Sequence, residues 1–214
     1  MFFGVGALYA QEHPFDTTLV EHNHTFFIRT RNVDSSEVIL SIKCDFKPMV
    51  SDTLWDLWEI QITDFNKDGY KDILLSYPAN GAANFTYDLY LFDTAINSFK
   101  SIAGFEDYPE ALSLTVDHRY YYSYERAGCA DMNWVSDLFT IQNFKIIHLG
   151  HIDGKGCDDA DKSNEVIKAY KSINYNNDKE TLIEQLPYNS NIPDNTSKWD
   201  FLKKYWNTNY KKFL

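Results

Sequence analysis

The sequence predicts a mainly β protein, an antiparallel meander that is propeller-like or a sandwich, followed by a C-terminal amphipathic helix. Before residue 152, short runs rich in Val, Ile, Phe, Tyr and Thr alternate with turn signals such as NVDSS and NKDG. No helical period interrupts these runs, which argues against parallel βαβ units. Aromatic residues make up 16% of the chain, a composition that favours β-structure.

The strands are expected to be short and to be joined by hairpins, because turn residues bound every apolar or alternating run. In chain order, the expected strands are residues 25–30, 37–44, 57–62, 72–77, 87–93, 112–116, 120–125, 137–142 and 145–152.

The C-terminal segment SKWDFLKKYWNTNYKKFL is expected to form the helix. Trp199, Leu202, Trp206 and Phe213 fall on one face of this helix, and lysines gather toward its C-terminal end, where the helix dipole favours cations. We expect the Trp face to pack on the sheet. Docking on a partner or on a membrane surface is the alternative.

The 214 residues are expected to divide into three segments. MFFGVGALYA is apolar and ends in small residues, so residues 1–10 are interpreted as a signal-peptide remnant, with an apolar first strand as the alternative. Residues 11–163 are expected to form a calcium-binding β domain. Residues 164–214 are interpreted as a polar linker, rich in Asn and Pro, and a C-terminal helix packed on that domain.

The net charge of −11 and the pI near 4.9 narrow the choice of partners. Nucleic acids and anionic membranes are recognised by clustered Lys and Arg, so neither is expected as a partner. A cation or a basic protein fits the charge better. No later run reaches the ~18 apolar residues that a transmembrane helix needs. Together with the interpretation of residues 1–10 as a signal-peptide remnant, this leads us to expect an exported protein, in the periplasm or outside the cell.

Three cysteines are present, an odd number that suggests one disulfide and one free thiol in an oxidising compartment. Cys129 and Cys157 lie in the glycine-containing acidic loops RAGCAD and GKGCDD, which flank two intervening strands. We therefore expect these two to pair. Cys44 lies in an apolar strand and is expected to be a small core residue.

The loop DFNKDGYKD, residues 64–72, carries the strongest chemical signal in the chain. Carboxylate and amide side chains occupy alternate positions and are followed by a glycine that permits a sharp turn. Calcium prefers six to eight oxygen ligands, which such a turn can direct to one point. The expected ligands are the side chains of Asp64, Asn66, Asp68 and Asp72 and the backbone carbonyl of Tyr70.

This loop differs from an EF-hand. The twelfth position is Leu75, where an EF-hand has a bidentate Glu, and the flanking segments are expected to be strands. The sequence therefore predicts a structural calcium site in a strand–loop–strand setting. A metal-free Asn/Asp/Gly turn is the alternative.

No catalytic motif is recognisable, and the protein is not expected to be an enzyme. The sequence has no G-x-S-x-G, Walker or H-E-x-x-H motif. His13, His22 and His24 lack a third ligand at suitable spacing and are interpreted as surface residues.

Two loops are candidates for contact with a protein partner, Tyr77–Asp88 and Tyr120–Trp134. The second combines tyrosines with charged residues and Trp, and such residues dominate the energetics of protein interfaces. Sheet core and ordinary turn surface form the alternative interpretation. The candidate contact residues are Tyr124, Glu125, Arg126, Asp131, Asn133 and Trp134.

The stretch ITDFNKDGYKDILLSYPANGAANFTYDLYLFD, followed by SFKSIAGFEDYPEALSL, resembles exported bacterial proteins that carry a single integrin/FG-GAP-like calcium loop. This family includes β-propeller-like immunity proteins that inhibit lysozyme-like peptidoglycan hydrolases. The resemblance covers residues 55–150 and does not include the C-terminal helix. It implies the same five calcium ligands and a loop that enters the hydrolase cleft.

The prediction is thus a non-catalytic, exported, calcium-binding protein that inhibits a peptidoglycan hydrolase by loop occlusion. Electrostatic steering would speed its association with a basic enzyme. One alternative is a glycan-binding or surface-adhesion module in which Trp55, Trp58 and tyrosines stack on sugars. Another is a calcium-stabilised structural protein of the cell envelope.

Overall fold

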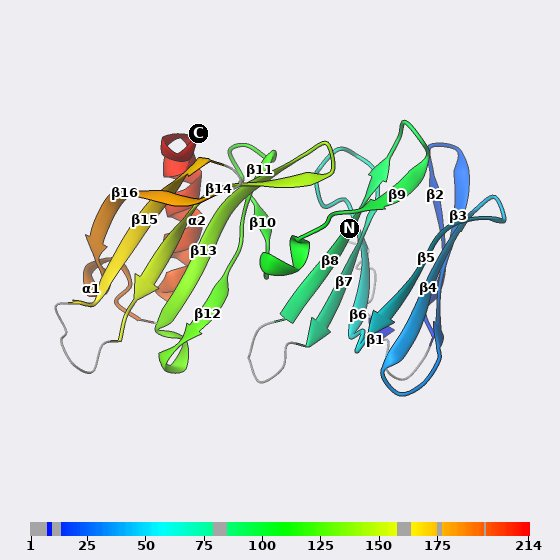
Figure 1. Ribbon diagram of the computed structural model, residues 1–214, viewed down its shortest axis with the longest axis horizontal. Helices are drawn as coiled ribbons and strands as arrows, with labels where there is room; N and C mark the ends of the chain where they lie inside the picture. The colour runs from blue at the N-terminus through cyan, green and yellow to red at the C-terminus, as the bar shows by residue number, and fades with distance from the viewer. Residues whose placement is uncertain (1–7, 10–13, 79–84, 158–163, 175–176, 195) are drawn as a thin grey trace, which may run out of the picture. The chain divides into compact units, whose positions relative to one another are not determined.

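The computed structural model describes residues 8–9, 14–78, 85–157, 164–174, 177–194 and 196–214. The chain forms two compact units (Figure 1). The first contains residues 1–81 and 85–107, and the second contains residues 82–84 and 108–214.

The first unit is built from two antiparallel sheets. One is a four-stranded meander in the order β2-β3-β4-β5. Its strands are β2 (Asp16–Glu21), β3 (His24–Asn32), β4 (Glu37–Cys44) and β5 (Lys47–Trp55). The other sheet has the order β1-β6-β7-β8-β9 and is followed by the short 3-10 helix η1 (Phe105–Asp107). Its strands are β1 (Leu8–Tyr9), β6 (Glu59–Thr63), β7 (Asp72–Pro78), β8 (Phe85–Asp93) and β9 (Ser98–Ser101).

The two sheets of the first unit share one hydrophobic core. The ring of Phe26 on β3 packs edge-to-face against Phe92 on β8 and Phe99 on β9, with ring centroids 5.5 and 5.3 Å apart. Leu40 on β4 and Leu75 on β7 are fully buried in the same cluster. The alternating apolar residues of each meander thus face the opposite sheet, as in a sandwich.

The second unit has a single antiparallel sheet in the order β10-β11-β13-β14-β15-β16, with β12 also paired to β13. Its strands are β10 (Leu112–Ser113), β11 (Tyr120–Tyr122), β12 (Glu125–Gly128), β13 (Asn133–Gln142), β14 (Lys145–Lys155), β15 (Val166–Asn174) and β16 (Asn177–Pro187). Its helices are η2 (Cys129–Asp131), α1 (Tyr188–Asn191), α2 (Ser197–Asn209) and η4 (Tyr210–Phe213).

Helix α2 runs along one face of this sheet (Figure 1) and confirms the predicted amphipathic helix. Leu202, Trp206 and Phe213 are buried, and Trp206 Nε1 donates a hydrogen bond to Ser136 Oγ on β13 at 2.8 Å. Trp199, expected on the same face, is 43% exposed because it lies in the first turn, at the margin of the contact. Neither α2 nor any other described helix has the length and apolar composition that a membrane crossing needs.

The structure differs from the predicted domain organisation in the segment interpreted as a linker. Within residues 164–214, a hairpin of β15 and β16 extends the sheet, and the boundary between units lies near residue 107 rather than 163. Ile167 and Ala169 of β15 are buried, whereas the described side chains of β16 are exposed or partly buried. This one-sided burial at a sheet edge gives the segment a polar composition that resembles a linker.

Only part of the predicted signal-peptide remnant lies within the described residues. Leu8 and Tyr9 form β1 and pair with Ile60 and Glu59 of β6. Residues 1–7 and 10 lie outside the described part of the chain.

Cys129 and Cys157 form a disulfide with a Cα–Cα distance of 6.2 Å, the pairing expected from the sequence. The bond ties η2 to the segment that follows β14. Cys44 is a buried free thiol.

Removing this disulfide should lower the free energy of unfolding by about 3–4 kcal/mol, because cross-linking a loop of this length restricts the unfolded chain. The sequence separation of the two cysteines is 28. Urea unfolding of Cys129→Ala/Cys157→Ala, followed by Trp fluorescence, measures the effect. Reduced wild-type protein should unfold at the same urea concentration as the double variant. Reductant should not change the urea midpoint of the double variant. Equal stability of oxidised wild type and double variant would contradict the prediction.

Candidate functional site

The acidic loop joins β6 to β7 and is a turn held by its own side chains. Asn66 Oδ1 accepts a hydrogen bond from Asp68 N at 3.1 Å, and Asp68 Oδ1 accepts one from Tyr70 N at 2.8 Å. Asp64 Oδ2 accepts a longer bond of 3.3 Å from Gly69 N. Gly69 has φ +96°, a conformation that few residues other than glycine adopt. The alternating polar positions therefore shape the turn itself.

Asp72 anchors the loop to the sheet. Its side chain is fully buried at the start of β7, and its two oxygens accept hydrogen bonds from Phe65 N and Phe92 N, both at 2.9 Å. Burial raises the pKa of Asp72 to about 6, and the charge of Asp68 adds to this effect. The structure thus gives Asp72 a role in orienting the loop, in addition to the ligand role expected from the sequence.

Asp64 carries an unsatisfied oxygen. Its Oδ1 atom is buried and has no hydrogen-bond partner among the described residues. An unpartnered buried acceptor costs about 1–3 kcal/mol, more when it is charged. A cation at this point would supply the missing partner, so the residues of the loop fit an oxygen-coordinated ion.

Two groups of three potential metal ligands lie within 4.8 Å of one another in the part of the chain that the structure describes. One is His24, Cys44 and Asp45, and the other is Asp137, His148 and His151. The three carboxylates of the acidic loop do not form such a group. Coordination by this loop would therefore depend on the Asn66 amide and the Tyr70 carbonyl as well as on carboxylates.

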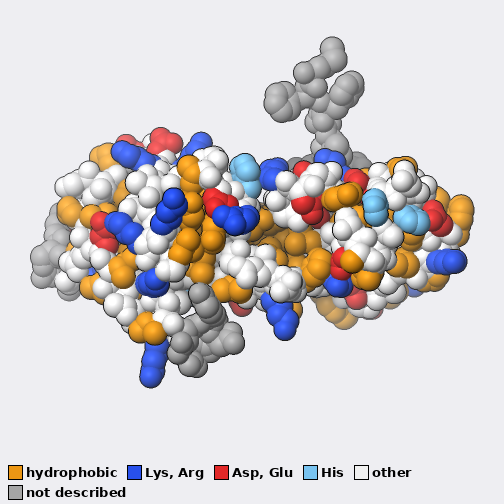
Figure 2. Space-filling model, turned by 90° about the horizontal axis from the view of Figure 1, so that it is seen from above, with side chains coloured by type: hydrophobic (Ala, Val, Ile, Leu, Met, Phe, Trp, Pro, Cys, Tyr) orange, Lys and Arg blue, Asp and Glu red, His pale blue; other side chains and the backbone are white. Residues whose placement is uncertain are grey.

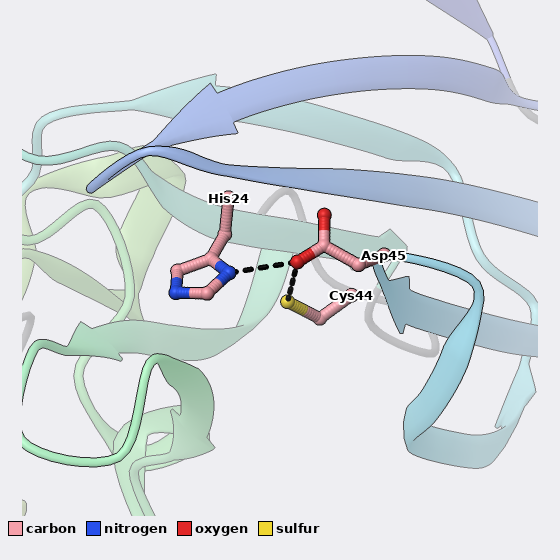
Figure 3. A group of neighbouring side chains, drawn as sticks. All are labelled: His24, Cys44 and Asp45. Atoms are coloured by element: carbon pink, nitrogen blue, oxygen red, sulfur yellow. Dashed lines mark hydrogen bonds and ion pairs between the residues drawn. The ribbon is translucent and has the colours of Figure 1, made fainter.

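The first group, His24, Cys44 and Asp45, lies at one end of the four-stranded sheet (Figure 3). His24 Nδ1 and Cys44 Sγ both approach Asp45 Oδ2, at 2.8 and 3.8 Å. Burial, with a contribution from Asp45, raises the pKa of the Cys44 thiol. Because the thiolate is the form that binds metals and attacks electrophiles, this environment disfavours both roles. His22 contacts Asn97 and is not part of the group, and His13 lies outside the described residues.

The structure corrects the predicted contact surface at Tyr120–Trp134. Trp134 is fully buried and Tyr124 is 2% exposed, so neither can contact a partner. Both belong to the core of the second unit and contact α2, Tyr124 through Trp199 and Trp134 through Phe201. Asn133 is also structural, since its Oδ1 accepts hydrogen bonds from Gly156 N and Cys157 N at 3.1 and 3.2 Å.

Asp131, in the connection between β12 and β13, ties this hairpin to α2. Lys198 is 1% exposed, and its Nζ donates to Asp131 Oδ2 at 2.6 Å and to the Asp131 carbonyl at 3.0 Å. The Tyr124 hydroxyl also donates to Asp131, and Arg126 lies 3.5 Å away. Burial acts against the charged carboxylate, yet the hydrogen bonds from Lys198 and Tyr124 hold the pKa of Asp131 below its usual range.

The exposed part of the β12–β13 hairpin consists of β12 and the first two residues of η2, residues 125–130, which we call the hairpin tip. Of the six predicted contact residues, Glu125 and Arg126 are exposed, and residues 127–130 continue this surface. Trp199 of α2 also lies in this region, which the sequence does not predict, because its ring packs against Tyr124 with ring centroids 4.2 Å apart. The other predicted contact loop, Tyr77–Asp88, lies partly outside the described residues, at positions 79–84.

The sugar-stacking alternative has limited support from the geometry. Trp55 is 59% exposed, but Trp58 is half-buried and lies 6.1 Å from the ring of Phe85. On the face seen in Figure 2, basic and acidic side chains are interspersed, which is not the clustered basic surface that nucleic acids require.

The comparison with known proteins identifies a fold and no family. No protein-family model matches the chain, and no curated protein matches its sequence. The chain is similar to a solved structure described as a Xanthomonas type IV secretion system related protein, with a TM-score of 0.52 and 15% sequence identity. The match covers 83% of this chain and 98% of that chain. At this identity the similarity concerns the fold, which is shared with a bacterial, secretion-related protein.

The substitution Lys198→Met should destabilise the protein by about 2–3 kcal/mol, because it leaves the Asp131 carboxylate without its main partner. The effect is smaller than for a fully buried pair, since 25% of the Asp131 side chain is exposed. The matched control Lys203→Met, at an exposed position of the same helix, should change stability by less than about 0.5 kcal/mol. Equal urea midpoints for the two variants would contradict a structural role of the pair.

Proposed function

We propose that this protein is an exported, calcium-stabilised bacterial protein that binds and inhibits a lysozyme-like peptidoglycan hydrolase. The family resemblance of residues 55–150 supports the inhibitor role, and the fold shared with a bacterial, secretion-related protein is compatible with export. The observation that carries the calcium part is the buried, unpartnered Oδ1 of Asp64 in a D-x-N-x-D-G turn.

Calcium would be held by the side chains of Asp64, Asn66 and Asp68, the carbonyl of Tyr70 and the carboxylate of Asp72. The hard oxygen donors of this set match the preference of calcium. Each carboxylate oxygen of Asp72 accepts one backbone hydrogen bond and retains a further lone pair. The ion would neutralise charge that the turn concentrates, and would thereby stabilise the junction of β6, β7 and β8.

Export is supported by the covalent chemistry of the chain. The Cys129–Cys157 disulfide is compatible with an oxidising compartment such as the periplasm. A peptidoglycan hydrolase acts in the same compartment or outside the cell, so inhibitor and target would meet there.

Inhibition would proceed by insertion of the exposed hairpin tip, residues 125–130, into the hydrolase cleft. The disulfide at Cys129 and the Asp131–Lys198 pair both hold the end of this segment, within η2. A braced loop loses less conformational entropy on binding than a mobile one. The net charge of −11 would steer the protein toward a basic enzyme.

Calcium should raise the melting temperature of the wild-type protein relative to EGTA. At a calcium concentration a hundred times Kd, the stabilisation is about 2.7 kcal/mol, which corresponds to several degrees. Asp64→Asn should lose most of this shift. The control Asp56→Asn removes one negative charge from an exposed turn outside the loop, and this variant should keep the full calcium-dependent shift in melting temperature. Identical melting curves of the wild type in calcium and EGTA would exclude a stabilising calcium site.

Wild-type protein with calcium should slow the clearing of a peptidoglycan suspension by lysozyme-like hydrolases. Ala127→Arg, which enlarges the exposed tip, should weaken inhibition at least tenfold while leaving the melting temperature unchanged. The control Ala95→Arg, in an exposed turn of the first unit, should inhibit like the wild type. If none of these hydrolases is inhibited while calcium still raises the melting temperature, the inhibitor role is excluded and the calcium site is not. Binding to the peptidoglycan itself, abolished by Trp55→Ala, would favour the glycan-binding alternative.

A further inference from the structure

We propose that the second unit carries a separate metal site for a divalent transition-metal ion such as Zn²⁺, formed by Asp137, His148 and His151. It lies on the face of the sheet opposite α2. Ser136 on β13 faces α2, because it accepts a hydrogen bond from Trp206, and its neighbour Asp137 therefore points to the other face. This proposal is independent of the calcium site and of hydrolase inhibition.

A β-bulge brings the two histidines to one face. In a regular strand, His148 and His151 would point to opposite faces, because they are three residues apart. On the partner strand, Phe139 pairs with His148 but Leu138 pairs with Gly150, so Leu149 is an extra residue in β14. The extra residue resets the alternation and turns His148 to the side of His151, and bulges of this kind are frequent beside functional sites.

Gly150 fixes the bulge. Its φ of +155° is unfavourable for other residues, and a Cβ atom there would lie 2.2 Å from the carbonyl oxygen of Tyr170. The bulge therefore requires glycine, and the relative position of the two imidazoles follows from the backbone.

The three side chains have the spacing of a metal site. Their ligand atoms lie within 4.8 Å of one another, and His148 Nε2 is 3.0 Å from Asp137 Oδ1. Bonds of about 2.0–2.1 Å in a tetrahedral arrangement place ligand atoms about 3.4 Å apart, so a small contraction closes the site. The side chains of Asp137, His148 and His151 are 20%, 26% and 20% exposed, which gives an ion access and leaves a coordination position open to water.

Each of the three ligands is oriented by a further hydrogen bond. The pairs are Ser123 Oγ with Asp137 Oδ2 (3.2 Å), Ser172 Oγ with His148 Nδ1 (2.9 Å) and Glu180 Oε1 with His151 Nδ1 (3.0 Å). Both imidazoles thus use Nδ1 for the outer contact, which leaves Nε2 as the donor atom for the ion. Such outer partners are the usual companions of metal-binding histidines.

The donor set selects the class of ion. Two imidazoles and one carboxylate suit zinc and neighbouring transition metals, whereas calcium and magnesium prefer oxygen donors alone. The same residues could instead form a hydrogen-bonded His–Asp network that binds no ion. The two interpretations differ in one measurable property, the stoichiometric binding of Zn²⁺.

The test is titration of the full-length, EDTA-treated protein with Zn²⁺ in the presence of calcium, by calorimetry and by competition with a chromogenic chelator. Wild type should bind one ion at this site. His148→Gln and His151→Gln should each weaken binding at least tenfold, and Ser172→Ala, which keeps all three ligands, by about 10–100-fold. His118→Gln, at an exposed turn, is the matched control and should bind like the wild type.

Melting curves recorded without zinc serve as the control that each variant is folded. The proposal is wrong if the wild type binds no Zn²⁺. It is also wrong if both histidine variants bind Zn²⁺ as the wild type does, or if binding is instead lost in His24→Gln, which removes a ligand of the other group.

Discussion

The contact between the Lys198 ammonium and Asp131 holds the β12–β13 hairpin of the second unit against α2. Lys198 is buried at 1% exposure, where an unpaired charge would be very unfavourable. Two hydrogen bonds to Asp131 and the ring of Tyr124, 4.9 Å away, replace the water that it loses. Because Lys198 belongs to α2 and Asp131 to the hairpin, the pair fixes where the helix begins relative to the exposed tip. The Cys129–Cys157 disulfide constrains the same hairpin two residues away.

A buried carboxylate serves a comparable purpose in the first unit. Asp72 is satisfied by two backbone N–H groups, one from the loop and one from β8, so its charge positions the turn rather than remaining free. Asp64, eight positions earlier, contrasts with it, because its buried Oδ1 has no donor among the described residues. The difference between a satisfied and an unsatisfied oxygen within one short loop is the observation on which the proposed calcium site rests.

Much of the fold could be predicted from local sequence, and the failures have identifiable causes. Most of the strands, the disulfide and α2 follow from alternation, cysteine placement and amphipathic spacing, whereas β2, β5 and β9 lie outside the expected strands. The β15–β16 hairpin is not expected from the sequence because few of its apolar residues are buried, Ile167 and Ala169 among them. The sequence predicts a contact role for Trp134 because residue type does not reveal which way a strand residue points until the register is known. For Asp72 it predicts a ligand role alone, because the two backbone donors of Asp72 come from positions that only the folded chain brings near.

The group of Asp137, His148 and His151 could not be predicted in this way, since regular alternation places its histidines on opposite faces. Gly150 within a strand was the one available signal of a bulge. The bulge also explains why the two proposed ion sites need not compete. The loop in the first unit offers oxygen donors from a turn, and the sheet in the second unit offers two imidazoles brought together by an extra residue. Donor chemistry would therefore separate the two proposed sites, since oxygen donors suit calcium and a set with two imidazoles suits zinc.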